Sequence, residues 1–276
     1  MKQRARYFYL IKKFLEKKLR KTLFYFTRIP LDWDDSSNWG DKLAPILVYK
    51  ITLKKSYKPV SDKLRRYFVI GSILERAGEN ALVWGAGFIS SNDVPSGRPR
   101  RIFAVRGPLT RDIFLRCGYK CPETYGDPAI LLPYFFQREV RKNFKYGVIP
   151  HYADKGNSWV LEQLQRYGSN VLLIDIEGGV EEVIDGICSC EYIFSSSLHG
   201  LICADTYGIP NVRLSLSNKV IGGDFKFIDY RLGVGGQPHE PIDPVRLGAC
   251  LESLLRFSSL ANLNQARKKL MAACPF

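Results

Sequence analysis

The segment 192–200, YIFSSSLHG, has the pattern of a buried strand that runs into three hydroxyls and then into the start of a helix. Ligands of open parallel sheets bind beyond the carboxyl ends of the strands, and a helix N-terminus offers free backbone N–H groups and partial positive charge. Ser195, Ser196 and Ser197 are therefore placed to bind an anion, and His199 can hydrogen-bond a phosphate or deliver a proton near neutral pH. In the alternative interpretation, Ser197 only caps the helix and His199 is a hydrogen-bonded residue of an internal interface.

Arg106 stands in a second strand-to-helix segment, residues 105–111 (VRGPLTR), which has a proline in the first helical turn. Its planar guanidinium suits a carboxylate or a phosphate, which it can hold with two parallel hydrogen bonds. The same position also fits a salt bridge at a domain interface, because such pairs are common.

Two aspartates follow turn-rich segments and can act as bases or bind sugar hydroxyls. Asp41 ends the segment 36–41 (SSNWGD), and Asp127 lies within 125–129 (YGDPA). Both fit equally well as helix caps or turn residues. The glycines of 84–88 (WGAGF) permit a close backbone approach but lack the full dinucleotide spacing, so we infer no nicotinamide cofactor.

The seven cysteines are odd in number and scattered, which favours reduced thiols. Cys117 and Cys121 are close together, as are Cys188 and Cys190, but neither pair has the two-residue gap of a zinc ribbon or a redox motif. We therefore predict no metal site and no cofactor.

The second half of the chain alternates strand and helix patterns, which is typical of a doubly wound parallel sheet. We predict strands at 146–149, 171–176, 192–194 and 211–214, and helices at 157–166, 180–188 and 198–207. The first half alternates less regularly, with strands predicted at 67–70, 81–84 and 102–105 and helices at 41–50 and 109–116. Asp243 and Pro244 pair a capping residue with a proline at the first helical position, so one or two helices should follow. The prediction is an α/β protein with two Rossmann-like domains, residues 30–143 and 144–276, facing a cleft.

The net charge of +14 is concentrated at the N-terminus. Residues 1–28 hold ten lysines and arginines against Glu16 alone, a local charge of +9 that leaves +5 for the rest of the chain. On a helix spanning residues 1–29, the apolar side chains share one face and most basic ones the other, which predicts a basic amphipathic helix on the inner leaflet of a membrane. In the alternative, its apolar face packs on the protein's own core or on an oligomer partner. The apolar face comprises Tyr7, Phe8, Ile11, Phe14, Leu15 and Leu19, and the basic face comprises Arg6, Lys12, Lys13, Lys17 and Arg20.

No apolar run reaches the roughly 18 to 20 residues of a membrane-spanning helix, and the N-terminus lacks the apolar core of a signal peptide. We therefore expect a cytoplasmic protein that is attached peripherally to the inner face of the plasma membrane. A nucleic-acid partner is not expected, because the excess charge lies in one helix rather than across a face with base-stacking aromatics.

Five segments, in their order and spacing, resemble the polysaccharide pyruvyltransferase family: residues 38–41, 84–87, 105–110, 125–129 and 195–200. The resemblance covers roughly residues 33–235. It is greatest to the exopolysaccharide ketal-pyruvate transferases of the succinoglycan and xanthan type, through 148–152 (VIPHY) and 223–230 (GDFKFIDY). The resemblance implies a GT-B-like pair of domains and phosphoenolpyruvate as co-substrate. It also implies an acceptor sugar with two suitably placed hydroxyls, in a surface polysaccharide or a lipid-linked oligosaccharide.

The resemblance further implies roles for single residues. His199 is expected to be the general acid, and Asp41 or Asp127 to act as the base. The acceptor is assigned to Asn38, Gly40 and His151.

The donor is assigned to Arg106 by the same resemblance. Many relatives also have an arginine two residues before the histidine, where this chain has Ser197. We then expect the donor phosphate to be bound by the serine hydroxyls and the helix N-terminus, or by a lysine such as Lys219 or Lys226.

Two other functions fit the same fold. A GT-B-type glycosyltransferase would use a nucleotide sugar, and its product would be a nucleoside diphosphate instead of the phosphate released from phosphoenolpyruvate. A non-catalytic carbohydrate-binding relative is the other alternative, and the serine at position 197 motivates it. Such a protein would bind sugar without turnover.

Overall fold

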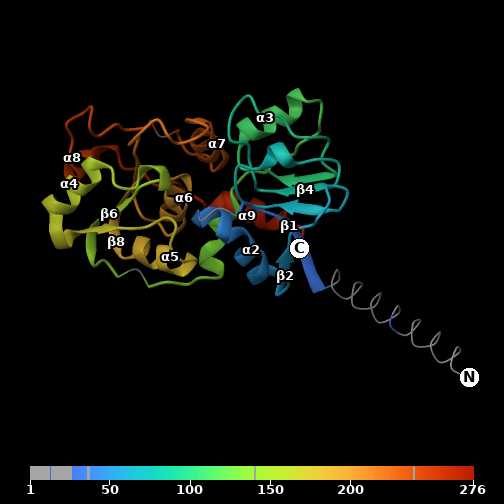
Figure 1. The fold of residues 1–276 in the computed structure, drawn as a ribbon, viewed down its shortest axis with the longest axis horizontal. Helices are drawn as coiled ribbons and strands as arrows, with labels where there is room; N and C mark the ends of the chain where they lie inside the picture. Colours follow the sequence, from blue (N-terminus) through green and yellow to red (C-terminus); the bar gives the residue numbers. More distant parts are fainter. Residues whose placement is uncertain (1–12, 14–26, 36–37, 140, 239) are drawn as a thin grey trace, which may run out of the picture.

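The structure is a computed structural model that describes residues 13, 27–35, 38–139, 141–238 and 240–276. Its named strands pair only in parallel, in two sheets, with helices packed around them (Figure 1). The prediction of a Rossmann-like α/β protein is confirmed at this level. The helix predicted at residues 1–29 lies outside the described residues, apart from Lys13 and the residues from 27 onward.

The first sheet has the strand order β2-β1-β3-β4-β5. The helix α2 (Trp39–Thr52) follows β1, and α3 (Pro108–Arg116) follows β5. Each strand and helix predicted for this half is present, within two residues at its ends. The strands are β1 (Arg28–Asp32), β2 (Lys55–Tyr57), β3 (Arg66–Phe68), β4 (Ala81–Trp84) and β5 (Arg101–Ala104).

Two strands of this sheet, β1 and β2, were not predicted from the sequence. Pro30 indicates a strand break because it cannot donate to a ladder, yet it lies inside β1, between β2 and β3. β2 is three residues long and begins with Lys55, the second of two adjacent lysines, so it carries little apolar pattern. β1 also begins at Arg28, two residues before the boundary predicted at residue 30.

The second sheet has the order β7-β6-β8-β9, and its strands alternate with helices as predicted. The α5 helix shows why: Val180, Val183, Ile184 and Ile187 repeat at helical spacing and are buried. The strands are β6 (Phe144–Ile149), β7 (Val171–Leu173), β8 (Cys190–Ser195) and β9 (Asn211–Arg213), and the helices are α4 (Ser158–Tyr167), α5 (Val180–Cys188), α6 (Leu198–Thr206) and α7 (Phe225–Gly233).

The chain after Asp243 forms a turn before any helix begins. The Asp243 carboxylate accepts hydrogen bonds from the N–H groups of Val245 and Arg246, but Gly248 adopts φ +56° and ends the turn. The predicted helices start later, as α8 (Leu251–Leu254) and α9 (Asn264–Ala272).

Buried tryptophans tie the two halves together. The Trp39 indole N–H donates to Val180 O at 3.1 Å, which joins α2 to α5. The Trp84 indole N–H donates to Leu270 O at 3.0 Å, so the C-terminal α9 returns to the first sheet. Figure 1 shows α2 and α9 between the two sheets, and α7 beside α3. Among the described residues, no helix has the length and apolar character needed to cross a membrane.

Candidate active site

The strand orders place a crevice in each sheet. From β6 the chain moves to β7 on one side and then to β8 on the other, so the order reverses between β6 and β8. It reverses in the same way between β1 and β3 in the first sheet. Ligands of open parallel sheets bind at such switch points, beyond the carboxyl ends of the strands. The residues that follow these four strands are therefore the candidate site residues.

A cavity of about 240 Å³ is lined by the segments that follow these strands and two others. Both halves of the chain contribute. After β1 come Asp34, Asn38 and Asp41, after β3 Gly71, Ser72 and Ile73, after β4 Ile89, after β6 His151 and Tyr152, after β8 Ser197, Leu198 and His199, and after β9 Ile221 and Lys226.

His199 and Asp127 form a pair at the inner wall of the cavity. The imidazole side chain is only 11% exposed, and its Nε2 lies 3.6 Å from Asp127 Oδ2, longer than a hydrogen bond. The other carboxylate oxygen of Asp127 accepts from Ala129 N at 2.9 Å, so this aspartate is also a cap, of the short helix Pro128–Tyr134. Among the described residues, the buried His199 Nε2 has no hydrogen-bond partner.

The N-terminus of α2 forms the wall next to His199. Asn38 caps this helix by accepting from Gly40 N at 3.3 Å, and Asp41 lies in its first turn and lines the cavity. Gly40 does not line the cavity but packs against His199: a Cβ at this position would lie 2.1 Å from His199 Nδ1. Only glycine leaves room for the imidazole here.

Of the three serines, Ser195 and Ser196 hydrogen-bond to neighbouring segments of the chain, and Ser197 lines the cavity. The Ser195 hydroxyl accepts from Ser197 N at 3.0 Å and lies within hydrogen-bonding distance of backbone carbonyls. The Ser196 hydroxyl accepts from His151 N and donates to Asp154 Oδ2, both at 2.8 Å. Ser197 alone of the three lines the cavity, as the N-cap of α6 without a side-chain capping bond.

Lys226 is the lysine that lines the cavity. Its amine donates to Ile221 O at 3.1 Å. Burial, reinforced by the charges of Arg106 and Arg213, lowers the pKa of Lys226 to about 8. Lys219, the other lysine predicted from the sequence, is exposed and lies outside the cavity lining.

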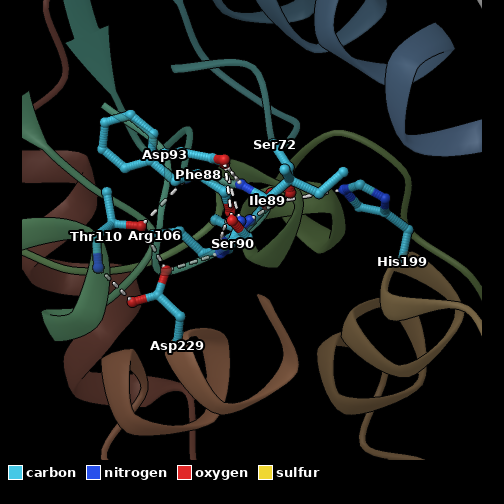
Figure 2. A network of polar contacts seen from close by, with 10 residues as sticks. Ser72, Phe88, Ile89, Ser90, Asp93, Arg106, Thr110, His199 and Asp229 are labelled. Carbon is cyan, nitrogen blue, oxygen red and sulfur yellow. Dashed lines mark hydrogen bonds and ion pairs between the residues drawn. The ribbon is translucent and has the colours of Figure 1, made fainter. Parts of the chain in front are cut away.

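Arg106 lies behind the cavity and does not line it. Its side chain is 1% exposed and forms an ion pair with Asp229 of α7, with 2.9 Å between Arg106 Nε and Asp229 Oδ2. Figure 2 shows the guanidinium inside this network, with the His199 imidazole to one side of it. The structure thus places Arg106 in the interface salt bridge that was the alternative interpretation.

His151 lines the cavity on the side of the second sheet. Its Nδ1 accepts from Ala153 N at 3.2 Å. Burial, and then the charge of Lys226, lowers the pKa of His151, so this imidazole favours the neutral form.

Sequence reasoning missed several residues of the site. Ser72 and Asp34 follow the carboxyl ends of β3 and β1, which is the signal that led to Ser197 and Arg106. Asp154 also follows a strand, β6, but its role was not readable from the sequence, because it depends on a 2.8 Å contact with Ser196, 42 positions away. Asp229 was noted only within the segment 223–230.

The chain matches a known protein family over most of its length. Residues 5–218 match the family model described as polysaccharide pyruvyl transferase. The chain is 34% identical over 203 residues to "Uncharacterized protein L143" of Acanthamoeba polyphaga mimivirus, covering 70% of this chain and 69% of that protein. It is 31% identical over 180 residues to "Succinoglycan biosynthesis protein ExoV" of Rhizobium meliloti (strain 1021), covering 61% of this chain and only 54% of that protein. No solved structure gives a significant match. The resemblance read from the five segments is therefore confirmed, and the chain belongs to the polysaccharide pyruvyl transferase family.

Proposed function

We propose that this protein transfers the pyruvyl group of phosphoenolpyruvate onto two hydroxyls of a sugar, in a surface polysaccharide or its lipid-linked precursor, and so forms a pyruvate ketal. The observation that carries the proposal is the meeting of His199, Asp41 and Lys226 in one cavity, with Asp127 behind the histidine. These residues supply an acid, a base and a cation within the space of a small substrate.

The reaction needs one proton delivered to carbon. His199 protonates the methylene carbon of phosphoenolpyruvate, which makes the central carbon electrophilic, and a sugar hydroxyl attacks that carbon. The C–O bond to phosphate then breaks, and a second hydroxyl closes the ketal. The two hydroxyl protons leave, and inorganic phosphate is the second product. The Asp127 carboxylate lies 3.6 Å from Nε2.

The remaining groups bind and orient. Lys226 and the first-turn N–H groups of α6, next to Ser197, hold the phosphate and carboxylate of the donor. Asp41 accepts a proton from the attacking hydroxyl, and Asn38 and His151 contact the acceptor sugar. We propose a reaction that draws on these side chains alone, with phosphoenolpyruvate as a co-substrate and no cofactor.

The arrangement of the two sheets supports the finer fold assignment. Loops at the carboxyl ends of strands from both sheets line one cavity, which is how a GT-B-like pair of domains would enclose its substrates. We therefore propose that the two halves of the chain are these domains.

We propose further that the protein binds the inner face of the plasma membrane from the cytoplasm. Residues 1–28 carry a charge of +9 and enter the fold through β1. Because the strands of the first sheet are parallel, their N-terminal ends share the edge opposite the cavity, and Arg28, Lys55 and Arg101 each begin a strand there. Anionic lipids attract such a surface by about 1 kcal/mol for each basic residue near the headgroups.

The deciding experiment is phosphate release from phosphoenolpyruvate across a panel of lipid-linked oligosaccharides. The proposal predicts release that depends on both substrates, and a product heavier by one pyruvate ketal. Release of a nucleoside diphosphate from a nucleotide sugar would instead identify a glycosyltransferase. Sugar binding without either product would identify a non-catalytic relative.

A further inference from the structure

The carboxylate of Asp229 is fully buried and accepts three hydrogen bonds from the first half of the chain. Its Oδ1 accepts from Thr110 N at 3.0 Å, and its Oδ2 accepts from Thr110 Oγ1 at 2.7 Å and from Arg106 Nε at 2.9 Å (Figure 2). Asp229 lies on α7, whereas Thr110 lies on α3 and Arg106 precedes Gly107, the N-cap of that helix. The carboxylate therefore docks α7 on the first half of the molecule.

Two glycines let the backbones approach closely at this joint. A Cβ on Gly107 would lie 1.8 Å from the Asp229 carbonyl oxygen, and a Cβ on Gly233 would lie 2.3 Å from the Arg106 carbonyl oxygen. A Cβ on Gly87 would fall 2.4 Å from Arg106 Cζ. The glycines of two sequence segments, 84–88 and 105–111, thus make room for this network.

The other two nitrogens of Arg106 support the cavity wall. Its Nη1 donates to Ser72 Oγ at 2.7 Å, and its Nη2 donates to Phe88 O at 2.5 Å. Ser72 lines the cavity, and so does Ile89, the residue after Phe88. Each of the three guanidinium nitrogens therefore donates a hydrogen bond within the protein. The guanidinium lies on the side of Ser72 and Phe88 that faces away from the cavity.

The docked helix carries Lys226 one turn before Asp229. Residues three apart lie on the same side of a helix, so the contact that seats Asp229 also orients Lys226. Gly222, in the segment that leads into α7, packs against Ile89: a Cβ there would lie 2.3 Å from the Ile89 carbonyl oxygen. The contact between Asp229 and Arg106 thus fixes the position of Lys226 relative to Ser72 and Ile89 of the cavity lining.

We propose that Asp229 is a positioning residue for donor binding: together with Arg106 it docks α7 so that Lys226 faces Ser72 across the cavity. The inference rests on the proposed function for the identity of the donor. In this proposal Arg106 affects donor binding by positioning Lys226, and it does not contact the donor itself.

Kinetics of the full chain test this assignment with single and paired substitutions. Thr110→Val, Asp229→Asn and Arg106→Lys should each raise the KM for phosphoenolpyruvate about tenfold or more, with a smaller change in kcat, because Lys226 is displaced. In a Lys226→Met background, the same substitutions should add no further rise, since they act through that amine. Arg111→Lys, in an arginine that pairs with Glu123 away from the cavity, is the matched control and should leave KM unchanged.

Two kinetic outcomes would overturn the proposal. If Arg106→Lys multiplies the KM rise of Lys226→Met, Arg106 contacts the donor itself. If the variants melt earlier but keep the wild-type KM, the network serves stability alone. Thr110→Val removes one hydroxyl and keeps the side-chain shape, so it tests the joint even where Asp229→Asn does not fold.

A readout without turnover separates this proposal from the proposed function. Lys226 in the wild type should react with an amine reagent with a midpoint near its pKa of about 8. In Asp229→Asn and Thr110→Val, the midpoint should move up toward that of an ordinary lysine as the amine leaves its buried position. An unmoved midpoint would sink the positioning role. Absence of phosphate release by the wild type would sink the proposed function and leave this measurement intact.

Discussion

His199 is the residue on which the proposed chemistry depends most. The substitution His199→Gln keeps much of the hydrogen bonding and removes the titratable acid, so kcat should fall by roughly two to four orders of magnitude while the donor KM changes less. A raised KM with a nearly normal kcat would make His199 a phosphate ligand, because a contact made equally in ground and transition states does not alter turnover. The reaction in deuterated water checks the same step: the ketal methyl group must gain one solvent deuterium.

Lys226 gives the donor site a testable pH dependence. Its pKa of about 8 means that the amine loses its charge as the pH rises through that value. The donor KM should therefore rise above pH 8, whereas an ordinary lysine stays protonated to about pH 10.4. Lys226→Arg should remove this rise, because a guanidinium keeps its charge. A KM that is flat from pH 7 to pH 10 in the wild type would show that Lys226 does not hold the donor.

The lowered pKa of Lys226 also determines how the stability of the fold should change with pH. Between about pH 8 and about pH 10.4, the unfolded chain binds more protons at this lysine than the folded chain does, so the contribution of Lys226 to stability should increase with pH across that window.

At the scale of elements, Gly40 in the first turn of α2 makes this helix less stable but leaves room for His199 in the site. Alanine is a better helix former than glycine by about 1 kcal/mol, yet a Cβ at Gly40 would overlap the His199 ring. Gly40→Ala should therefore lower kcat about tenfold or more while the melting temperature stays within a few degrees. Gly186→Ala in α5 is the matched control, since the nearest atom, 3.3 Å away, belongs to the Ile174 side chain. Equal activity of both variants would contradict the assigned place of His199.

At the scale of the whole molecule, removal of residues 1–26 tests the membrane proposal and keeps β1, which begins at Arg28. The truncated protein should move from the membrane fraction to the soluble fraction and still melt cooperatively. High salt should weaken attachment of the full chain, because screening shortens the reach of basic charge. If the truncated protein aggregates, the segment belongs to the core or to an oligomer interface, as in the alternative interpretation.

Local pattern by itself determined most of the second half. In 192–200 the strand, the turn and the start of the helix follow from burial, hydroxyls and spacing within nine residues, and the α5 helix matches its predicted bounds, 180–188. Asn38 and Asp41 were singled out by their turn-rich segment, and Lys226 was named only through the family resemblance. The places of His151, Ser197 and His199 were readable, because each follows the carboxyl end of a predicted strand. The strands β1 and β2 were not, since a proline and a lysine pair mask them while the neighbouring strands supply their hydrogen bonds.

Only the tertiary structure decided what Arg106 and the lysines do. A strand end predicts that a guanidinium can meet an anion, but not whether the anion is a ligand or a carboxylate of the protein. Asp229, 123 positions away, occupies Arg106, and the same docking brings Lys226 into the cavity and leaves Lys219 outside it. The physical reason is that a buried ion pair depends on which distant element packs there, and packing between elements leaves no local pattern in the sequence.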